Sequence, residues 1–199
     1  MQCFRDSQRK EGVGNHAQKN TIQYAERNEQ KREAFIAEIE ALPEDTELHY
    51  GDESGFDEYY SREYGYALRG EPVIGIVNGR HFARTSIVAA KSKDEVIAPF
   101  AFSGSMNGDL FFGWLEHVYV PALRNPSKTV LLLDNATHHP KDAIFDIAEE
   151  YGFKVIFLPP YSPDLNKPIE TFWANVKRRL RLHMHKFPAF SDALAHAFI

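Results

Sequence analysis

The sequence predicts one α/β domain, in which helices cover a mixed sheet of about five strands. Segments rich in β-branched and aromatic residues come first, and apolar segments then alternate with segments of helical periodicity. A chain of 199 residues, 43% hydrophobic and 26% charged, is long enough for one well-buried core. We expect residues 1–23 to be a loose lead-in and residues 24–199 to form the domain.

The first predicted elements are a helix and a short strand. Residues 26–42 carry apolar side chains at helical spacing, and Pro43 ends this run. The following stretch, residues 47–56, begins with an extended segment that we expect to close on Asp52.

An antiparallel meander and a helix should come next. Residues 72–77, 81–90 and 95–104 are rich in residues that favour strands, and turn-forming residues separate them. Residues 107–124 place their apolar side chains on one helical face, with Pro121 as a kink or a stop.

The last third of the chain alternates strand and helix. Residues 128–136 contain the continuous apolar run of a central strand that is buried on both faces. Pro140 opens a predicted helix at residues 140–151, and a second buried strand follows at residues 153–160, where two prolines end it. The final predicted helix carries Glu170 in its first turn.

Composition excludes several classes of protein. No apolar run approaches the roughly 18 residues that a membrane span needs, and the polar N-terminal residues do not resemble a signal peptide, so a cytoplasmic protein is expected. The single cysteine, Cys3, excludes an internal disulfide and a cysteine-based zinc site. The net charge of −5 argues against a nucleic-acid partner, but residues 171–186 hold five Lys and Arg residues and no acidic residue.

Three acidic residues stand where predicted elements begin or end. Asp52 closes the first strand, Asp134 ends the apolar strand, and Glu170 begins the last helix. Because polar groups at the carboxyl ends of strands line the ligand crevice of open α/β sheets, we expect these carboxylates to converge. Aspartates at strand ends also commonly bond to the backbone of the turn, and this alternative stays open for Asp52 and Asp134.

The last helix has a predicted core face and a cationic flank. Glu170 borders the core face, with Lys177 and Arg181 on the same flank, and Arg178 belongs to the same basic run. These three cations are candidate DNA contacts, although a solvated helix face has a similar composition. The core face is a stripe of roughly 100°: Ile169, Phe172, Trp173, Val176 and Leu180.

Three carboxylates without a thiol favour Mg²⁺ or Mn²⁺ over zinc. Two such ions about 3.5–4 Å apart, bridged by one aspartate, would activate a water or hydroxyl for phosphodiester cleavage. His138 and His139 are more typical of a structural role than of ligands. Glycoside hydrolysis needs only two carboxylates, but it accounts for neither the third acid nor the basic helix.

Three stretches carry these acids: GDESGF, LLLDNATHH and LPPYSPDLNKPIETFWANVKRRL. Together they resemble the catalytic core of mariner-type DDE transposases, in the branch carried by bacterial insertion sequences. Each stretch is weak evidence alone. Their order, and the 35 residues between Asp134 and Glu170, make the resemblance specific.

The resemblance implies a ribonuclease H-like fold and a metal-dependent DNA endonuclease that cuts at the ends of a mobile element. The freed 3′ hydroxyl would then attack target DNA. Asp52 and Asp134 match the two aspartates of the family, and Glu170 matches its final acid. The implied cofactor is Mg²⁺ or Mn²⁺, as two ions, and the implied partner is double-stranded DNA.

Two departures from the family bear on activity. The family usually reads DLNPIE, whereas Lys167 adds one residue ahead of Glu170 here. Family members also usually carry helix-turn-helix modules before the catalytic core, and the lead-in has no room for them. The chain is therefore expected to be the catalytic half, with a separate helix-turn-helix chain or a second copy of itself as further candidate partners.

Two alternatives share the expected fold. One is a related nuclease without strand transfer, and the other is a decayed or domesticated remnant that binds DNA without cutting it. Lys167 favours the remnant. In each case we expect a cytoplasmic protein that associates with the nucleoid when it binds DNA.

Overall fold

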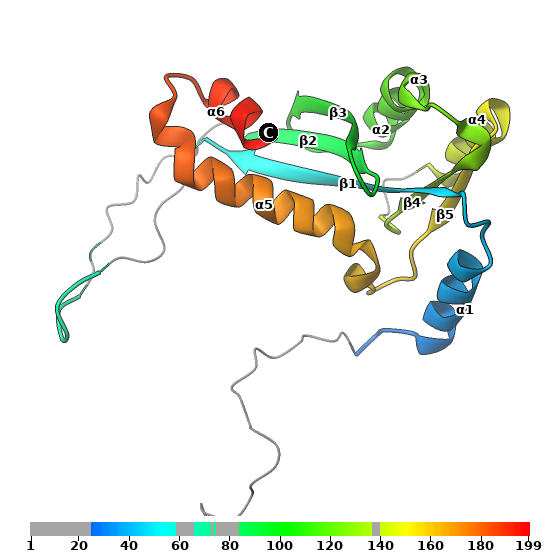
Figure 1. The fold of residues 1–199 in the computed structure, drawn as a ribbon, viewed down its shortest axis with the longest axis horizontal. Helices are drawn as coiled ribbons and strands as arrows, with labels where there is room; N and C mark the ends of the chain where they lie inside the picture. The colour runs from blue at the N-terminus through cyan, green and yellow to red at the C-terminus, as the bar shows by residue number, and fades with distance from the viewer. Residues whose placement is uncertain (1–24, 59–65, 73, 75–83, 137–139) are drawn as a thin grey trace, which may run out of the picture.

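A five-stranded mixed sheet with the order β3-β2-β1-β4-β5 is the centre of the fold (Figure 1). The first three strands form an antiparallel meander, and β4 and β5 add parallel to β1. The computed structural model describes residues 25–58, 66–72, 74, 84–136 and 140–199. The strands are β1 (Glu47–Asp57), β2 (Arg84–Lys91), β3 (Val96–Ser103), β4 (Thr129–Leu133) and β5 (Lys154–Phe157).

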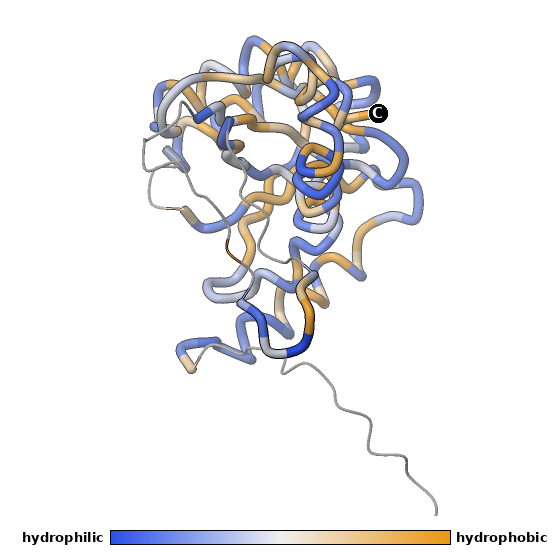
Figure 2. The backbone as a smooth tube through the Cα atoms, turned by 90° about the vertical axis from the view of Figure 1, so that its left-hand side faces the viewer, coloured by the Kyte–Doolittle hydropathy of each residue, from blue (hydrophilic) through white to orange (hydrophobic). Residues whose placement is uncertain are grey.

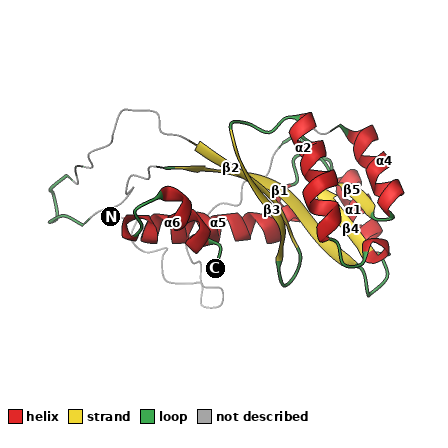
Figure 3. Ribbon diagram, turned by 90° about the horizontal axis from the view of Figure 1, so that it is seen from above, coloured by secondary structure: helices red, strands yellow, loops and turns green. Residues whose placement is uncertain are grey.

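Helices lie on both faces of this sheet (Figure 3). One face carries α1 (Glu29–Glu40), α5 (Lys167–His183) and α6 (Phe190–Ala197). The other carries α2 (Gly108–Trp114), the π-helical turn η1 (Leu115–Tyr119), α3 (Val120–Ala122) and α4 (Lys141–Tyr151). Short 3₁₀ turns are η2 (Pro126–Lys128), η3 (Pro163–Asn166) and η4 (Met184–Lys186). None of the helices in these described ranges is long and apolar enough to cross a membrane.

Apolar residues are concentrated on the two faces of the sheet, and polar residues dominate the outer turns (Figure 2). One cluster joins alternate residues of β4 and β2 to α2, η1 and α4, with Trp114 and Tyr119 fully buried in it. On the opposite face, α5 and α6 pack against β1 and β2, and α1 packs against β4 and β5. All five residues of β4 are buried, as expected for a strand covered on both faces.

Most predicted elements are confirmed. The helix predicted over residues 26–42 is α1, and the segments at 81–90 and 95–104 are β2 and β3. The helix predicted over residues 107–124 ends at Ala122, one residue after Pro121. The core face of α5 is confirmed, since Ile169, Trp173, Val176 and Leu180 are buried.

Some predictions fall on residues that the structure does not describe. The lead-in at residues 1–23 is one, and His138 and His139 are others. Of the strand predicted at residues 72–77, only Pro72 and Ile74 are described, and neither belongs to a strand.

One prediction about the elements was wrong, and one helix was missed. Strand β1 does not close at Asp52 but continues to Asp57, because β2 pairs with it up to Arg84 after the pairing with β4 has stopped at Tyr50. Strand β4 lies inside the sheet, between β1 and β5, as predicted. Helix α6 was not predicted, and it covers part of β2 with Leu194 and two small residues.

Gly51 allows β1 and β4 to lie close together. A Cβ atom at this position would stand 2.6 Å from Cδ2 of Leu133 and 3.3 Å from Cδ1 of Leu131. Both leucines are fully buried, so neither has free space to move into. The glycine is therefore required for packing directly beside Asp52.

Gly51→Ala should lower the free energy of unfolding by about 1–3 kcal/mol, because an added methyl overpacks a filled core. Urea denaturation followed by circular dichroism measures this change. Gly113→Ala is the matched control, because a Cβ there meets nothing within 4 Å. Alanine in α2 should instead stabilise the protein by about 0.5–1 kcal/mol. Equal effects of the two substitutions would contradict the packing argument.

Candidate active site

A pocket of about 660 Å³ opens where β1, β4 and α5 meet. Its acidic lining residues are Asp52 from β1, Asp134 directly after β4, and Glu170 from α5. Much of the remaining wall is the segment 158–163, which connects β5 to η3 and contains three prolines. The structure therefore brings the three predicted acids to one pocket.

The two aspartates reach the pocket from neighbouring strands. The parallel register pairs Tyr50 of β1 with Leu132 of β4, so Asp52 and Asp134 lie two residues further along their respective strands. Since side chains two residues apart point to the same face, Asp52 shares the face of Tyr50, against which α5 packs. The parallel pairing thus sets the two aspartates side by side.

Asp134 also bonds to its own turn. Its Oδ1 accepts a hydrogen bond from the backbone N–H of Ala136 at 3.3 Å. This is the structural role that strand-end aspartates commonly have. The same carboxyl group lines the pocket, so its bond to the turn also helps to fix its position there.

Glu170 lies in the first turn of α5, and the extra residue does not remove it from the pocket. Lys167 is the first residue of the helix, with φ −50° and ψ −37°, and Pro168 follows in the first turn. Asn166 precedes the helix without a side-chain cap bond. The additional residue is absorbed as helix, and Glu170 still lines the pocket with both aspartates.

Asn166 holds a buried oxygen for which the described residues provide no donor. The residue is 5% exposed, it lines the acidic pocket, and its Oδ1 accepts no hydrogen bond from the described part of the chain. A buried amide oxygen without a partner costs free energy, so this atom suits a donor or a cation in the pocket.

Burial and like charge disfavour ionisation in the pocket. Burial raises the pKa of Asp52 to about 7; a backbone hydrogen bond partly opposes the rise, and the charges of Asp134 and Glu170 add to it. Burial also raises the pKa of Glu170, with a further contribution from the charge of Asp164. A bound cation would relieve both effects, because it stabilises the carboxylate forms.

The cations of α5 divide between two sides of the helix. Lys177 is half-buried over the ring of Phe56, 5.7 Å from its centroid, on the flank that also carries Glu170 and Arg181. Arg178 is exposed and, at 100° per residue, points away from the core stripe toward solvent. Of the three predicted DNA contacts, Lys177 and Arg181 therefore continue the row that starts at the pocket.

Arg84 of β2, which no sequence pattern marks, lies near this row but on the other face of the sheet. It stands three residues before Ile87, which packs against α5, so alternation along β2 turns Arg84 to the opposite face. Its guanidinium occupies the space that a Cβ at Gly55 would take, and the register pairs it with Asp57. Burial lowers the pKa of Lys177, and the charge of Arg84 lowers it further.

The donor set of the pocket fits a hard cation. Carboxylate oxygens and the amide oxygen of Asn166 are the ligand types that Mg²⁺ and Mn²⁺ prefer. Among the described residues, no three His, Cys, Asp or Glu side chains are already grouped closely enough to hold one ion. The carboxyl groups share a pocket, and a modest rearrangement is required to bring all three to one ion.

Comparison with known families gives a clear result. The family described as DDE superfamily endonuclease matches residues 47–192, which include all three acids. The chain belongs to this family. A comparison with curated protein sequences gave no match.

Solved structures support the fold assignment. The Mos1 strand transfer complex matches with a TM-score of 0.62 and 19% identity, covering 92% of this chain and 57% of that chain. The mariner Mos1 paired end complex with Mg matches with a TM-score of 0.61 and 20% identity, covering 76% of this chain and 50% of that chain. The predicted ribonuclease H-like fold is thereby confirmed, and the chain spans about half the length of these Mos1 chains.

Asp52→Asn should stabilise the metal-free protein at pH 8. The folded-state pKa of about 7 lies above the ordinary value of about 3.9, so the folded protein loses stability as pH rises between them. Asparagine avoids this loss, and we expect a melting temperature about 4 °C or more above wild type at pH 8 and little difference at pH 4. Differential scanning calorimetry in EDTA measures both melting temperatures, and Asp146→Asn at an exposed position of α4 is the control. A melting temperature of Asp52→Asn below that of wild type at pH 8 would contradict the raised pKa.

Proposed function

We propose that this DDE endonuclease domain is the catalytic domain of a transposase. It hydrolyses a phosphodiester at each end of a mobile element. The freed 3′ hydroxyl then attacks a phosphodiester of the target DNA, so that the element end is joined to the target strand. The observation that carries the proposal is the pocket in which Asp52, Asp134 and Glu170 meet. All three acids lie within residues 47–192, the stretch that matches the DDE superfamily endonuclease family, and this supports the assignment.

The proposed metal ligands are Asp52, Asp134 and Glu170, with two Mg²⁺ or Mn²⁺ ions as the cofactor. Mos1 complexes with Mg and with Mn are similar structures, which supports this choice. When bound, such ions supply Lewis-acid activation of a water or hydroxyl and stabilise the leaving oxygen. Asp134 would be the ligand shared by both ions, and the buried Asn166 oxygen would accept a hydrogen bond from a water in the pocket.

The cation row positions the DNA. Lys177 and Arg181 lie on the flank of α5, with Lys177 over Phe56 of β1, and Arg84 lies where β2 pairs with the end of β1, on the other face of the sheet. Phosphates bound along this row would be held at a fixed distance from the acidic pocket, so that the scissile phosphate enters it. Contacts of this kind position a duplex without reading its sequence.

Residues 24–199 form the catalytic domain, and a separate helix-turn-helix chain supplies recognition of the element ends. A second copy of this chain is a further partner, as a homodimer. The partner is double-stranded DNA, both as element end and as target. The protein acts in the cytoplasm and associates with the nucleoid when bound to DNA.

Asp134→Asn should abolish cleavage while the fold remains intact, because it removes a ligand charge with almost no change of volume. Even outer partners of a metal site cost about 10–100-fold when removed, so we expect a loss of more than about 100-fold. Nicking of a supercoiled plasmid with Mn²⁺, resolved on agarose, gives the rate. Asp146→Asn is the matched control, and a Mn²⁺-dependent rate for Asp134→Asn equal to wild type would refute the assignment.

Arg84→Ala and Arg181→Ala should weaken binding to any duplex by similar factors. Each loses one phosphate contact, so the slope of log affinity against log salt should fall by about one. Titrations of two unrelated duplexes by fluorescence anisotropy at several salt concentrations test this, with dissociation constants of about 10⁻⁴ to 10⁻⁶ M expected near physiological salt. Lys93→Ala, at the opposite end of β2, should leave the slope unchanged; an unchanged slope for Arg84→Ala would remove Arg84 from the interface.

A further inference from the structure

Helix α1 lies before the part of the chain that matches the family, yet it packs against the pocket wall. The family match begins at Glu47, and α1 ends at Glu40. Phe35 of α1 belongs to the same apolar cluster as Leu158 and Leu165, which flank the proline segment. The helix therefore contacts the loop that leads into α5.

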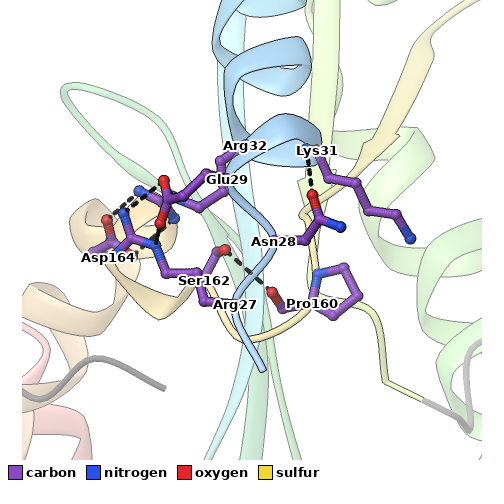
Figure 4. Close-up of polar contacts among 8 residues, drawn as sticks. All are labelled: Arg27, Asn28, Glu29, Lys31, Arg32, Pro160, Ser162 and Asp164. Carbon is purple, nitrogen blue, oxygen red and sulfur yellow. Dashed lines mark hydrogen bonds and ion pairs between the residues drawn. The ribbon is translucent and has the colours of Figure 1, made fainter. Parts of the chain in front are cut away.

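The strongest contact is a bidentate ion pair between α1 and η3 (Figure 4). Nη1 and Nη2 of Arg32 donate to the two carboxylate oxygens of Asp164 at 3.0 and 2.7 Å. The side chain of Arg32 is 7% exposed, and that of Asp164 is 54% exposed. Two parallel bonds fix the orientation as well as the distance of the carboxylate, which a single ammonium contact cannot do.

Both partners of the pair are themselves held in place. Asn28 caps α1, accepting a hydrogen bond from the backbone N–H of Lys31 at 3.0 Å, so the first turns of the helix are well formed. On the loop side, the Ser162 hydroxyl donates to the Pro160 carbonyl at 3.2 Å (Figure 4). The backbone N–H of Leu165 then donates to the carbonyl of Ser162 at 3.1 Å.

Asp164 is the residue through which α1 reaches the acid on α5. The turn η3 spans Pro163–Asn166 and passes directly into α5, whose first turn contains Glu170. The connector makes no sheet ladder, because β5 ends at Phe157. Side-chain contacts therefore determine where α5 begins. Among the described residues, the ion pair of this turn is the one between Arg32 and Asp164, and the charge of Arg27 helps to lower the pKa of Asp164.

We propose that Arg32 is a positioning residue of the active site, which fixes Glu170 through its bidentate pair with Asp164. The inference rests on the proposed function, since it concerns the placement of the third metal ligand. It also makes α1 part of the catalytic unit, although the family match does not include that helix.

The test compares two ion pairs that both attach α1 to the rest of the fold. Asp164→Asn and Arg32→Lys break the bidentate pair, whereas Glu38→Gln breaks the pair between Glu38 and Lys154 of β5, which are 2.7 Å apart. Glu38 and Lys154 are both about half exposed, so the control loses an attachment of α1 that does not involve η3. Calorimetric titration with Mn²⁺ in the absence of DNA measures metal affinity, and hydrogen exchange measures the protection of residues 163–170.

Both substitutions in the Arg32 pair should weaken Mn²⁺ binding by about 10-fold or more, the size of effect seen for partners that orient metal ligands. They should also raise the hydrogen-exchange rates of residues 163–170. Glu38→Gln should leave the affinity within about twofold of wild type and those rates unchanged. Asp164→Asn keeps the test decisive if Arg32→Lys fails to fold, because Asp164 is largely exposed.

Two outcomes separate the inference from the function on which it rests. If the wild-type chain binds no Mn²⁺, the proposed function fails, and the exchange rates alone still decide whether the pair orders η3. If the wild type binds Mn²⁺ and Asp164→Asn changes neither affinity nor exchange, the positioning role of Arg32 is overturned.

Discussion

The fold has to overcome the electrostatic repulsion among three acidic side chains, and the rest of the structure depends on how it does so. Asp52, Asp134 and Glu170 line one pocket, and burial together with like charge raises the pKa of Asp52 to about 7. Without other contacts to hold them, such carboxylates would move apart or bind protons. The fold opposes separation because two of the acids directly follow the paired segments of β1 and β4, and the third belongs to a helix packed against β1 and β2.

No Lys or Arg is among the described residues that line the pocket, and this separation of charge suits the proposed chemistry. Lys177 and Arg181 lie on the flank of α5 and Arg84 at the start of β2, and the charge of Asp52 partly opposes the lowering of the Lys177 pKa. A polyanion with bound divalent ions presents the complementary pattern, with cations at the acids and phosphates along the basic row. The arrangement is therefore least stable without a ligand. A ligand that brings divalent cations to the acids and phosphates to the basic residues stabilises it most.

Much of this arrangement follows from the sequence, for identifiable reasons. Periodicity predicts α1, α4 and α5, and the core face of α5 is correct because an amphipathic helix of 17 residues carries a strong signal. The three acids that share the pocket were singled out because each stands where a predicted element begins or ends, and the resemblance to a family motif marks the same residues. Strand β1 was predicted to end too early, because GDESG is polar and contains glycines, and only the partner β2 explains why it stays extended.

Other features depend on tertiary contacts that no local pattern encodes. Arg84 lies beside Gly55 because the register of β1 with β2 pairs it with Asp57, two residues further along β1. Arg32 lies on a helix of mixed polarity, and its partner Asp164 is 132 residues away along the chain. Helix α6 is short and rich in alanine, so its place over β2 is set by packing more than by its own propensity.

The three acids differ in how firmly the chain holds them. Asp52 lies inside the central strand, so displacing it requires breaking ladders on the sheet itself. Glu170 follows a connector of prolines and one 3₁₀ turn, whose attachments are a few side-chain contacts. Segments of this kind open at a lower free energy than sheet cores. Heating or denaturant should therefore withdraw Glu170 before the sheet melts, so that catalytic competence is lost in a first, local transition while the protein still shows native secondary structure.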